Sequence, residues 1–397
     1  MKNVAIVGGG ASGLFVANML KADYKVTIFE KNDRVGKKLL QTGNGRCNLS
    51  NLHSCNDLDK FCLNYNNFEF AKQIFTNFSV EDTIKAFEKL GLLLTYQDDL
   101  IYPATYQAST VLDVLRLNLN SNVKIICNCE IVSITKKNAK FFLTDNEGKT
   151  YYQDIVILCG GGNSSVTSNP CYKLVTQLGH TLTALYPSLA PIKCVDAFLK
   201  GLNGIKANVK ASLYNSGRLV QSVNGEVMFK DYGISGIAIF ELSRFKIDNN
   251  SKIELDLFPD IDIDTIITNR CKTNLTCENL FTGLLNNKIA LNLLFKLGYD
   301  VSTPLSQVDA IRICNLVKKV SLTQLSVLPF DKSQVTKGGV DLSQVDAQTM
   351  SSNLVEDLYF IGELLDIDGN CGGYNLQFAW SSAGICAKSI NSLLSNR

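Results

Sequence analysis

Four short stretches of the chain are apolar or nearly so, and three of them run directly into glycine. They span residues 4–7, 26–29, 155–159 and 358–361. Continuous apolar runs of this length are typical of strands buried on both faces of a parallel sheet. Apolar residues at helical spacing follow the first run, between Leu14 and Leu20. The order strand, glycines, helix, strand predicts an α/β fold of the Rossmann type.

The middle of the chain carries two other patterns. Residues 192–251 contain short alternating stretches between turn signals, which predict an antiparallel β unit with a helix in the segment GISGIAIFELSRF. Residues 262–320 place apolar residues three and four positions apart, which predicts helices. We therefore predict a discontinuous Rossmann-like domain over 1–190 and 335–397, a β-barrel-like inserted domain over 191–258 and 321–334, and a helical subdomain over 259–320.

The composition of the chain limits the kinds of chemistry that the protein can carry out. The chain has 397 residues, 46% of them hydrophobic, and a net charge of +2, and it contains no apolar run long enough to span a membrane. We expect a soluble cytoplasmic protein with reduced thiols, because its 13 cysteines show no disulfide framework. Only two histidines are present, which argues against a histidine-based triad or zinc site. We therefore predict no metal, and chemistry carried by an organic cofactor.

The glycines after the first strand have the spacing of a dinucleotide-binding turn. Gly8 and Gly10 permit a tight turn and close approach of a pyrophosphate, and Gly13 lets helix and strand pack. Glu30 ends the second strand, where a carboxylate is placed to accept hydrogen bonds from a ribose diol. We expect this site to be formed by Gly8, Gly10, Ala11, Ser12, Gly13, Glu30 and Lys31.

The segment KNDRVGKKLLQTGNGRCNLSN distinguishes FAD from NAD as the dinucleotide. A simple NAD-binding domain continues directly with another strand and helix, whereas this loop combines glycines, polar side chains and positive charge, as expected beside an extended FAD. A solvated surface loop is the alternative reading. The residues predicted to contact FAD here are Lys38, Thr42, Gly43, Asn44, Gly45 and Arg46.

Two later segments repeat the pattern of a strand ending in glycine. We expect FAD contacts from the first of them and from the turn GGYN, which precedes a helix whose free amides can face the pyrimidine end of the flavin. The predicted residues are Ile131, Cys159, Gly160, Gly161, Gly362, Glu363, Gly373, Tyr374 and Asn375.

The stretches GGGASGL, GKKLLQTGNGRCNLSN, GISG, TKGGV, GGYN and FAWSSAG together resemble the BaiN/RdsA-like family of bacterial NAD(P)/FAD-dependent oxidoreductases, also called aminoacetone oxidase family flavoproteins. The resemblance covers essentially the whole chain. It implies a fold of the two-dinucleotide-binding-domain flavoprotein type and an FAD-dependent redox reaction. The sequence departs from the family pattern in the segment NSSVTSNPCYKL, which has no further glycine run and includes Pro170. This leaves open how the loop formed by this segment closes over the flavin.

Three residues are candidates for catalysis. Arg46 can stabilise negative charge on a substrate carbonyl, and Cys47 can protonate carbon after hydride delivery. A small buried residue packing beneath the ring is the alternative for Cys47. His53 is a further candidate acid, although an isolated histidine is more often structural.

Three functions are open, and the resemblance implies the first two of them. The first is NAD(P)H-driven reduction of an activated carbon–carbon double bond, in a small steroid-like enone or in a uridine of ribosomal RNA. The second is an amine oxidase that produces hydrogen peroxide, and the third is a flavin-binding or RNA-binding protein without turnover. We expect no membrane association and no stable protein partner. Six basic residues of the inserted part form either an RNA-binding surface or an ordinary solvated face: Lys200, Lys206, Lys210, Arg218, Lys230 and Arg244.

Overall fold

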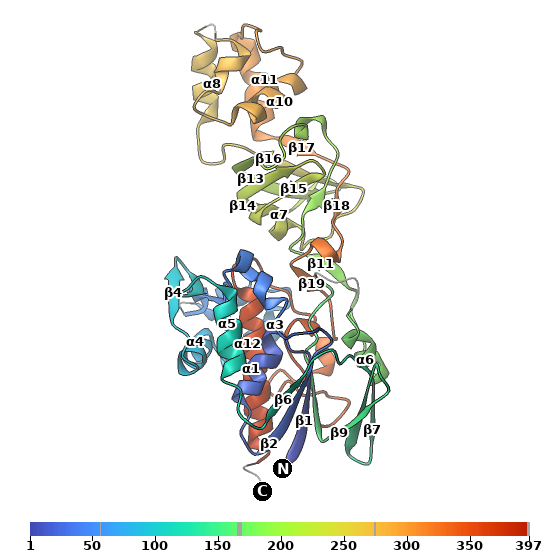
Figure 1. Cartoon of the computed structure of the whole chain (residues 1–397). Coiled ribbons are helices and arrows are strands. Elements are labelled where there is room, and N and C mark those ends of the chain that lie inside the picture. Colours follow the sequence, from blue (N-terminus) through green and yellow to red (C-terminus); the bar gives the residue numbers. More distant parts are fainter. Residues whose placement is uncertain (56, 165–168, 274, 395–397) are drawn as a thin grey trace. The chain divides into compact units, whose positions relative to one another are not determined.

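A computed structural model describes residues 1–55, 57–164, 169–273 and 275–394 (Figure 1). The chain divides into two compact units, Met1–Tyr186 with Val335–Arg397, and Pro187–Gln334. The short strands β11 (Tyr186–Ser188) and β19 (Val335–Lys337) lie where the chain leaves the first unit and returns to it. The finer division into three domains stays a prediction, and the loop before Pro170 lies partly outside the described residues.

The first unit is built on a parallel sheet with the strand order β20-β10-β1-β2-β6. All residues of β10 and β20 are buried, which explains their uninterrupted apolar sequences. Figure 1 shows α1, α5 and α12 beside this sheet, with α1 packed against α12. The elements are β1 (Lys2–Val7), α1 (Ala11–Met19), β2 (Tyr24–Phe29), α5 (Ala108–Leu117), β6 (Val123–Ile126), β10 (Ile155–Leu158), β20 (Leu358–Phe360) and α12 (Tyr374–Ser392).

Smaller elements surround this sheet. One antiparallel group has the order β3-β5-β4 and another the order β7-β8-β9. Helix α4 begins with a capping box between Ser79 and Asp82, as its sequence favours. The bounds are β3 (Ser50–Asn51), α2 (Leu58–Cys62), α3 (Phe68–Asn77), α4 (Val80–Lys89), β4 (Leu94–Gln97), β5 (Leu100–Pro103), β7 (Ile131–Lys137), β8 (Lys140–Asp145), β9 (Thr150–Gln153) and α6 (Cys171–Gln177).

The second unit contains an antiparallel sheet with the order β17-β16-β13-β14-β15-β12-β18. Buried and partly exposed residues alternate along β16, as expected for a sheet with one face on the core. The predicted helix of this region is shorter than its motif and follows a strand. The bounds are β12 (Ile192–Lys193), β13 (Lys206–Asn215), β14 (Arg218–Lys230), β15 (Gly233–Ser235), α7 (Ile237–Leu242), β16 (Ser251–Asp256), β17 (Val320–Leu322) and β18 (Ser326–Val327).

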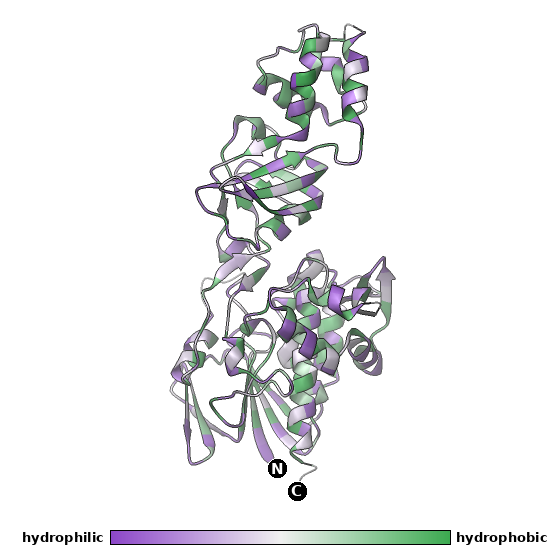
Figure 2. Ribbon diagram, turned by 180° about the vertical axis from the view of Figure 1, so that it is seen from behind, coloured by the Kyte–Doolittle hydropathy of each residue, from purple (hydrophilic) through white to green (hydrophobic). Residues whose placement is uncertain are grey.

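The helices of the second unit share one apolar cluster with its sheet. Leu293 and Val317 on the helices belong to the same cluster as Leu213 and Ile253 on the strands. Figure 2 shows hydrophobic and hydrophilic stretches alternating along these helices, as expected when one face is buried. The helices are α8 (Ile263–Cys271), α9 (Cys277–Leu280), α10 (Asn287–Lys296) and α11 (Gln307–Lys318).

The α/β fold and the inserted antiparallel sheet with helices are therefore as predicted. Among the described residues, no helix is both long enough and apolar enough to cross a bilayer.

Candidate active site

Three of the glycines after β1 meet different surroundings. A Cβ added at Gly13 would lie 2.0 Å from the carbonyl oxygen of Gly8, and one at Gly8 would lie 2.6 Å from the carbonyl oxygen of Cys159. These two glycines are required for close packing. A Cβ at Gly10 would have nothing within 4 Å, so the backbone before Ala11 is open at the start of α1. An open, glycine-lined helix N-terminus fits a pyrophosphate.

Glu30 follows β2 and is almost fully buried beside the glycine loop. One carboxylate oxygen accepts a hydrogen bond from the Gly9 amide at 2.9 Å. The other accepts from the backbone and side-chain amides of Asn32, at 2.9 and 2.6 Å. Each carboxylate oxygen can accept more than one hydrogen bond, so the orientation is fixed while acceptor capacity remains for a ribose hydroxyl. The neighbouring Lys31 is exposed.

The segment after Val35 lies against the glycine loop. The Gly36 amide donates to the Gly9 carbonyl at 2.8 Å. The short 3₁₀ segment Leu39–Gly45 ends in left-handed backbone at Gly43, Asn44 and Gly45. Before these residues the Thr42 hydroxyl donates to the Leu39 carbonyl. This backbone reverses the chain in few residues, which explains the glycine content.

Arg46 and Cys47, at the end of this turn, lie in opposite environments, one exposed and the other buried. Arg46 is exposed, and its guanidinium lies 5.5 Å from the ring centroid of Tyr102. Cys47 is fully buried and adopts a left-handed conformation with φ of 57°, its amide donating to Thr42 at 3.0 Å. Burial raises the pKa of the Cys47 thiol to about 12. Protein atoms alone cover this thiol, which favours the packing alternative over a role as proton donor.

Lys38 and Glu363 were predicted to contact FAD, but their side chains pair with each other at 2.6 Å. The second Glu363 oxygen accepts from the Ser164 hydroxyl at 3.1 Å and from the Thr336 amide at 2.9 Å. Sequence reasoning missed Ser164 and Thr336. The Glu363 carboxylate therefore joins three segments of the first unit. A cofactor that contacts this carboxylate would have to share its oxygens with these donors.

The segments after β10 and β20 lie close to the glycine loop. The Cys159 thiol donates to the Gly8 carbonyl at 3.1 Å, which places the start of the Gly160–Gly161 turn beside Gly8. A Cβ at Gly362 would lie 2.7 Å from the Ser12 hydroxyl. Residues near the two ends of the sequence therefore meet at one place. Ile131, in contrast, is a buried residue at the start of β7.

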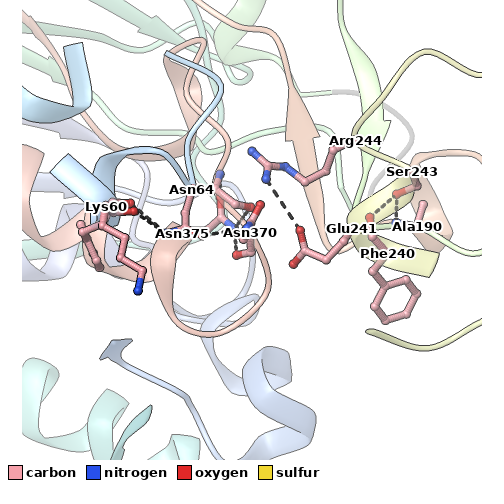
Figure 3. Close-up of polar contacts among 11 residues, drawn as sticks. Lys60, Asn64, Ala190, Phe240, Glu241, Ser243, Arg244, Asn370 and Asn375 are labelled. Carbon is pink, nitrogen blue, oxygen red and sulfur yellow. Dashed lines mark hydrogen bonds and ion pairs between the residues drawn. The ribbon is translucent and has the colours of Figure 1, made fainter. Parts of the chain in front are cut away.

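The turn before α12 is held by asparagine side chains (Figure 3). The Asn375 carboxamide accepts from the Gly369 amide at 2.8 Å and donates to the Gly369 carbonyl at 2.9 Å. Asn370 donates to the Asn64 side chain at 2.8 Å, as Figure 3 also shows. The predicted contact between Asn375 and FAD would therefore have to come from its backbone amide. Gly373 caps the helix with φ of 92°.

His53 is bonded at both ring nitrogens. Its Nδ1 lies 3.0 Å from the Tyr374 hydroxyl, and its Nε2 lies 2.8 Å from a carboxylate oxygen of Asp99. This leaves neither ring nitrogen free in the described structure, which favours a positioning role over that of an acid. Sequence reasoning missed Asp99, because nothing in its local pattern points to a partner 46 residues earlier.

The open glycine loop, the carboxylate after β2 and the helix start after Gly373 together define a Rossmann-type flavoprotein. The chain belongs to the family described as HI0933-like protein Rossmann domain, which matches residues 2–389. This confirms the resemblance to BaiN/RdsA-like proteins, and the protein is an FAD-dependent oxidoreductase.

Two relatives match almost end to end. A 3-dehydro-bile acid delta(4,6)-reductase of Clostridium scindens is 32% identical, and the match covers 98% of each chain. A ribosomal RNA dihydrouridine synthase of Haemophilus influenzae is 28% identical, over 97% of this chain and 98% of the relative. Among solved structures, the 3-ketosteroid-delta4-(5alpha)-dehydrogenase of Rhodococcus jostii RHA1 has a TM-score of 0.52 at 12% identity, over 98% of this chain and 97% of that chain. This last likeness concerns the fold alone.

Proposed function

We propose that the protein reduces a carbon–carbon double bond conjugated to a carbonyl group, using FAD and an NAD(P)H donor in the cytoplasm. The observation that carries the proposal is the end-to-end match to a reductase at 32% identity. The name of the second relative indicates the same bond chemistry, because dihydrouridine differs from uridine by saturation of a conjugated ring double bond. The two relatives thus differ in substrate but share a reaction class.

Bound FAD would supply the hydride for this reaction. The open backbone at Gly10 and the start of α1 would hold the pyrophosphate, and Glu30 would accept hydrogen bonds from the ribose. The first amides of α12 would favour negative charge on the flavin. These roles use groups that the fold already orients, so little rearrangement would be needed on binding.

Arg46 is our candidate for polarising the substrate. Its guanidinium is exposed at the end of the left-handed turn, and a cation there would stabilise negative charge that develops on a carbonyl oxygen during hydride transfer. We propose water as the source of the proton, because the Cys47 thiol is covered and both His53 ring nitrogens are engaged. Arg46→Ala should therefore slow the step from reduced flavin to substrate, and Arg46→Lys, which keeps a cation, should slow it less.

Among possible substrates, we propose a uridine of ribosomal RNA ahead of a steroid-like enone. Four of the six basic residues noted in the sequence remain candidates to contact phosphate. Lys206 instead pairs with Glu226 at 3.0 Å, and Arg244 pairs with Glu241 at 3.7 Å. Lys200 lines a cavity of about 390 Å³ within the second unit, together with Lys193 and Tyr232. Positive charge beside an aromatic ring suits single-stranded RNA.

The test separates the two half-reactions. Under anaerobic conditions, NADPH and NADH should each be mixed with the oxidised protein, and the reduced protein then mixed with a dienone steroid or with uridine-containing RNA fragments. We expect reduction by one nicotinamide and reoxidation by one of the two substrate classes. Mass analysis of ribosomal RNA from a deletion strain should show a missing dihydrouridine. Rapid reduction by small amines, with hydrogen peroxide formed in air, would overturn the proposal in favour of an oxidase.

A further inference from the structure

Three side chains from distant parts of the first unit form a continuous hydrogen-bonded series. Asp99 lies in the turn between β4 and β5, His53 in a 3₁₀ turn, Leu52–Cys55, and Tyr374 is the first residue of α12. Asp99 is 2.8 Å from His53 Nε2, and the Tyr374 hydroxyl is 3.0 Å from His53 Nδ1. The series connects a surface turn to the beginning of a largely buried helix.

The chemistry of the three groups sets the direction of their hydrogen bonds. An ionised carboxylate only accepts, so a neutral His53 carries its proton on Nε2 and donates it to Asp99. Its Nδ1 is then an acceptor, and the Tyr374 hydroxyl must donate to it. Asp99 therefore selects one tautomer of His53, and that tautomer selects one orientation of the Tyr374 hydroxyl.

Tyr374 is held at other points as well. Its carbonyl accepts from the Tyr65 hydroxyl at 2.8 Å, and its ring packs against Phe61 with centroids 5.0 Å apart. The ring is almost fully buried, while about half of the His53 and Asp99 side chains is exposed. The hydroxyl bond to His53 thus fixes the outer end of a side chain whose inner end is packed.

The backbone before Tyr374 is attached to the segment that carries His53. Asn51 donates to the Gly372 carbonyl at 3.0 Å and accepts from the His53 amide at 3.0 Å. A Cβ at Gly373 would lie 2.6 Å from the carbonyl oxygen of Ser50, so the backbone of the helix start lies directly on this segment. Movement of His53 would therefore be transmitted to the first turn of α12 both through a side chain and through the backbone.

We propose that Asp99 and His53 are positioning residues that hold the first turn of α12 and thereby set the affinity and reduction potential of the flavin. The inference rests on the proposed orientation of this helix start toward the flavin. Amides held at a fixed position stabilise a negative charge, and hence the reduced flavin, more than amides that move. Because the Asp99–His53 pair is half exposed, its own contribution is modest, and we expect effects of about twofold to fivefold in FAD affinity.

The first measurement uses the protein without flavin. His53 and His180 are the only histidines in the sequence, so a protein labelled with ¹⁵N at histidine gives two sets of ring signals, which a His53→Gln variant assigns. We expect the Nε2–H tautomer in the neutral form of His53. In Asp99→Ala this preference should be lost, and in Asp99→Glu it should be largely restored. An unchanged tautomer in Asp99→Ala would overturn the proposed series.

The second measurement uses the full chain loaded with FAD. Asp99→Ala and His53→Gln should each weaken FAD binding by about twofold to fivefold and make the reduction potential more negative, with Asp99→Glu close to wild type. Asp113→Ala is a matched control, because Asp113 is a similarly exposed carboxylate whose ion-pair partner, Arg116, does not belong to this series. Circular dichroism and thermal unfolding report whether each variant folds.

The outcomes separate this inference from the proposed function. If the wild type binds FAD and both variants match Asp113→Ala in affinity and potential, the positioning role is wrong whatever the substrate. If the variants shift the potential while the wild type reduces neither a dienone nor uridine, the proposed reaction is wrong and the positioning role stands. If the wild type binds no FAD, both are wrong.

Discussion

Cys47→Ala is the substitution that most directly separates packing from chemistry in the TGNGRCN turn. The thiol is fully buried, and its pKa is raised to about 12 by burial. Proton donation would leave a buried thiolate at a cost of roughly 7 kcal/mol at pH 7. A general acid contributes about 10²- to 10⁴-fold, or roughly 3 to 5 kcal/mol, so the cost exceeds the usual gain.

We therefore expect Cys47→Ala to change both half-reactions by less than about threefold and to lower the free energy of unfolding by about 1 kcal/mol, the cost of a small cavity. Cys47→Ser should stay closer to wild type in stability than Cys47→Ala, because the Thr42 side chain that bonds the thiol can also bond a serine hydroxyl. Cys62→Ala is the matched control, since Cys62 is also fully buried in the first unit and its thiol pKa is also raised to about 12.

The assay measures FAD content, thermal unfolding, and the two half-reactions by stopped-flow absorbance for Cys47→Ala, Cys47→Ser and Cys62→Ala. Our reasoning would be refuted if Cys47→Ala kept its FAD and its reduction by NAD(P)H while the reaction with substrate slowed by about 10²-fold or more. Loss of FAD in Cys47→Ala but not in Cys62→Ala would instead show that the turn is a binding element.

Three further predictions follow from single contacts. Glu30→Ala should weaken FAD binding by about 1 to 3 kcal/mol, measured by calorimetry, because it removes a buried acceptor. Gly10→Ala should weaken FAD binding while the free energy of unfolding changes by less than about 0.5 kcal/mol, since its Cβ meets open space, whereas Gly13→Ala should destabilise the fold. Burial lowers the pKa of His180, so the stability that its neutral form contributes should be lost as the pH falls below about 6.5, and a titration of unfolding free energy for His180→Gln should show a weaker decrease.

The strands of the parallel sheet could be predicted because the signal for their burial lies within each strand's own sequence. Residues 155–158 and 358–360 are buried without exception, and one further buried residue separates each strand from a glycine. A strand that is buried on both faces is apolar throughout, so it can be recognised without knowing which strands it pairs with. The short strands β12 and β18 contain two residues each, too few for an alternating pattern to identify them.

The candidate site could be predicted only in part, for a related reason. The glycines and Glu30 act through backbone conformation and chain order, which the sequence displays directly. The partners of His53 are 46 and 321 residues away, and those of Glu363 also come from distant segments. Such pairs carry no periodic signal, so a single sequence points to the residues and not to their contacts.

Cys47 shows why a residue type alone does not define a role. A cysteine between arginine and asparagine in a polar motif is expected at a surface, where it would meet substrate. The left-handed conformations at Gly43, Asn44, Gly45 and Cys47 reverse the chain there, so that Arg46 points outward and the next side chain is buried. The glycine content of the turn indicates in the sequence that the chain reverses here. The direction of each side chain, however, can be derived only when the backbone angles are known. The turn therefore exposes its cation and buries its thiol, and this arrangement agrees with our proposal that Arg46 stabilises negative charge on the substrate while water supplies the proton.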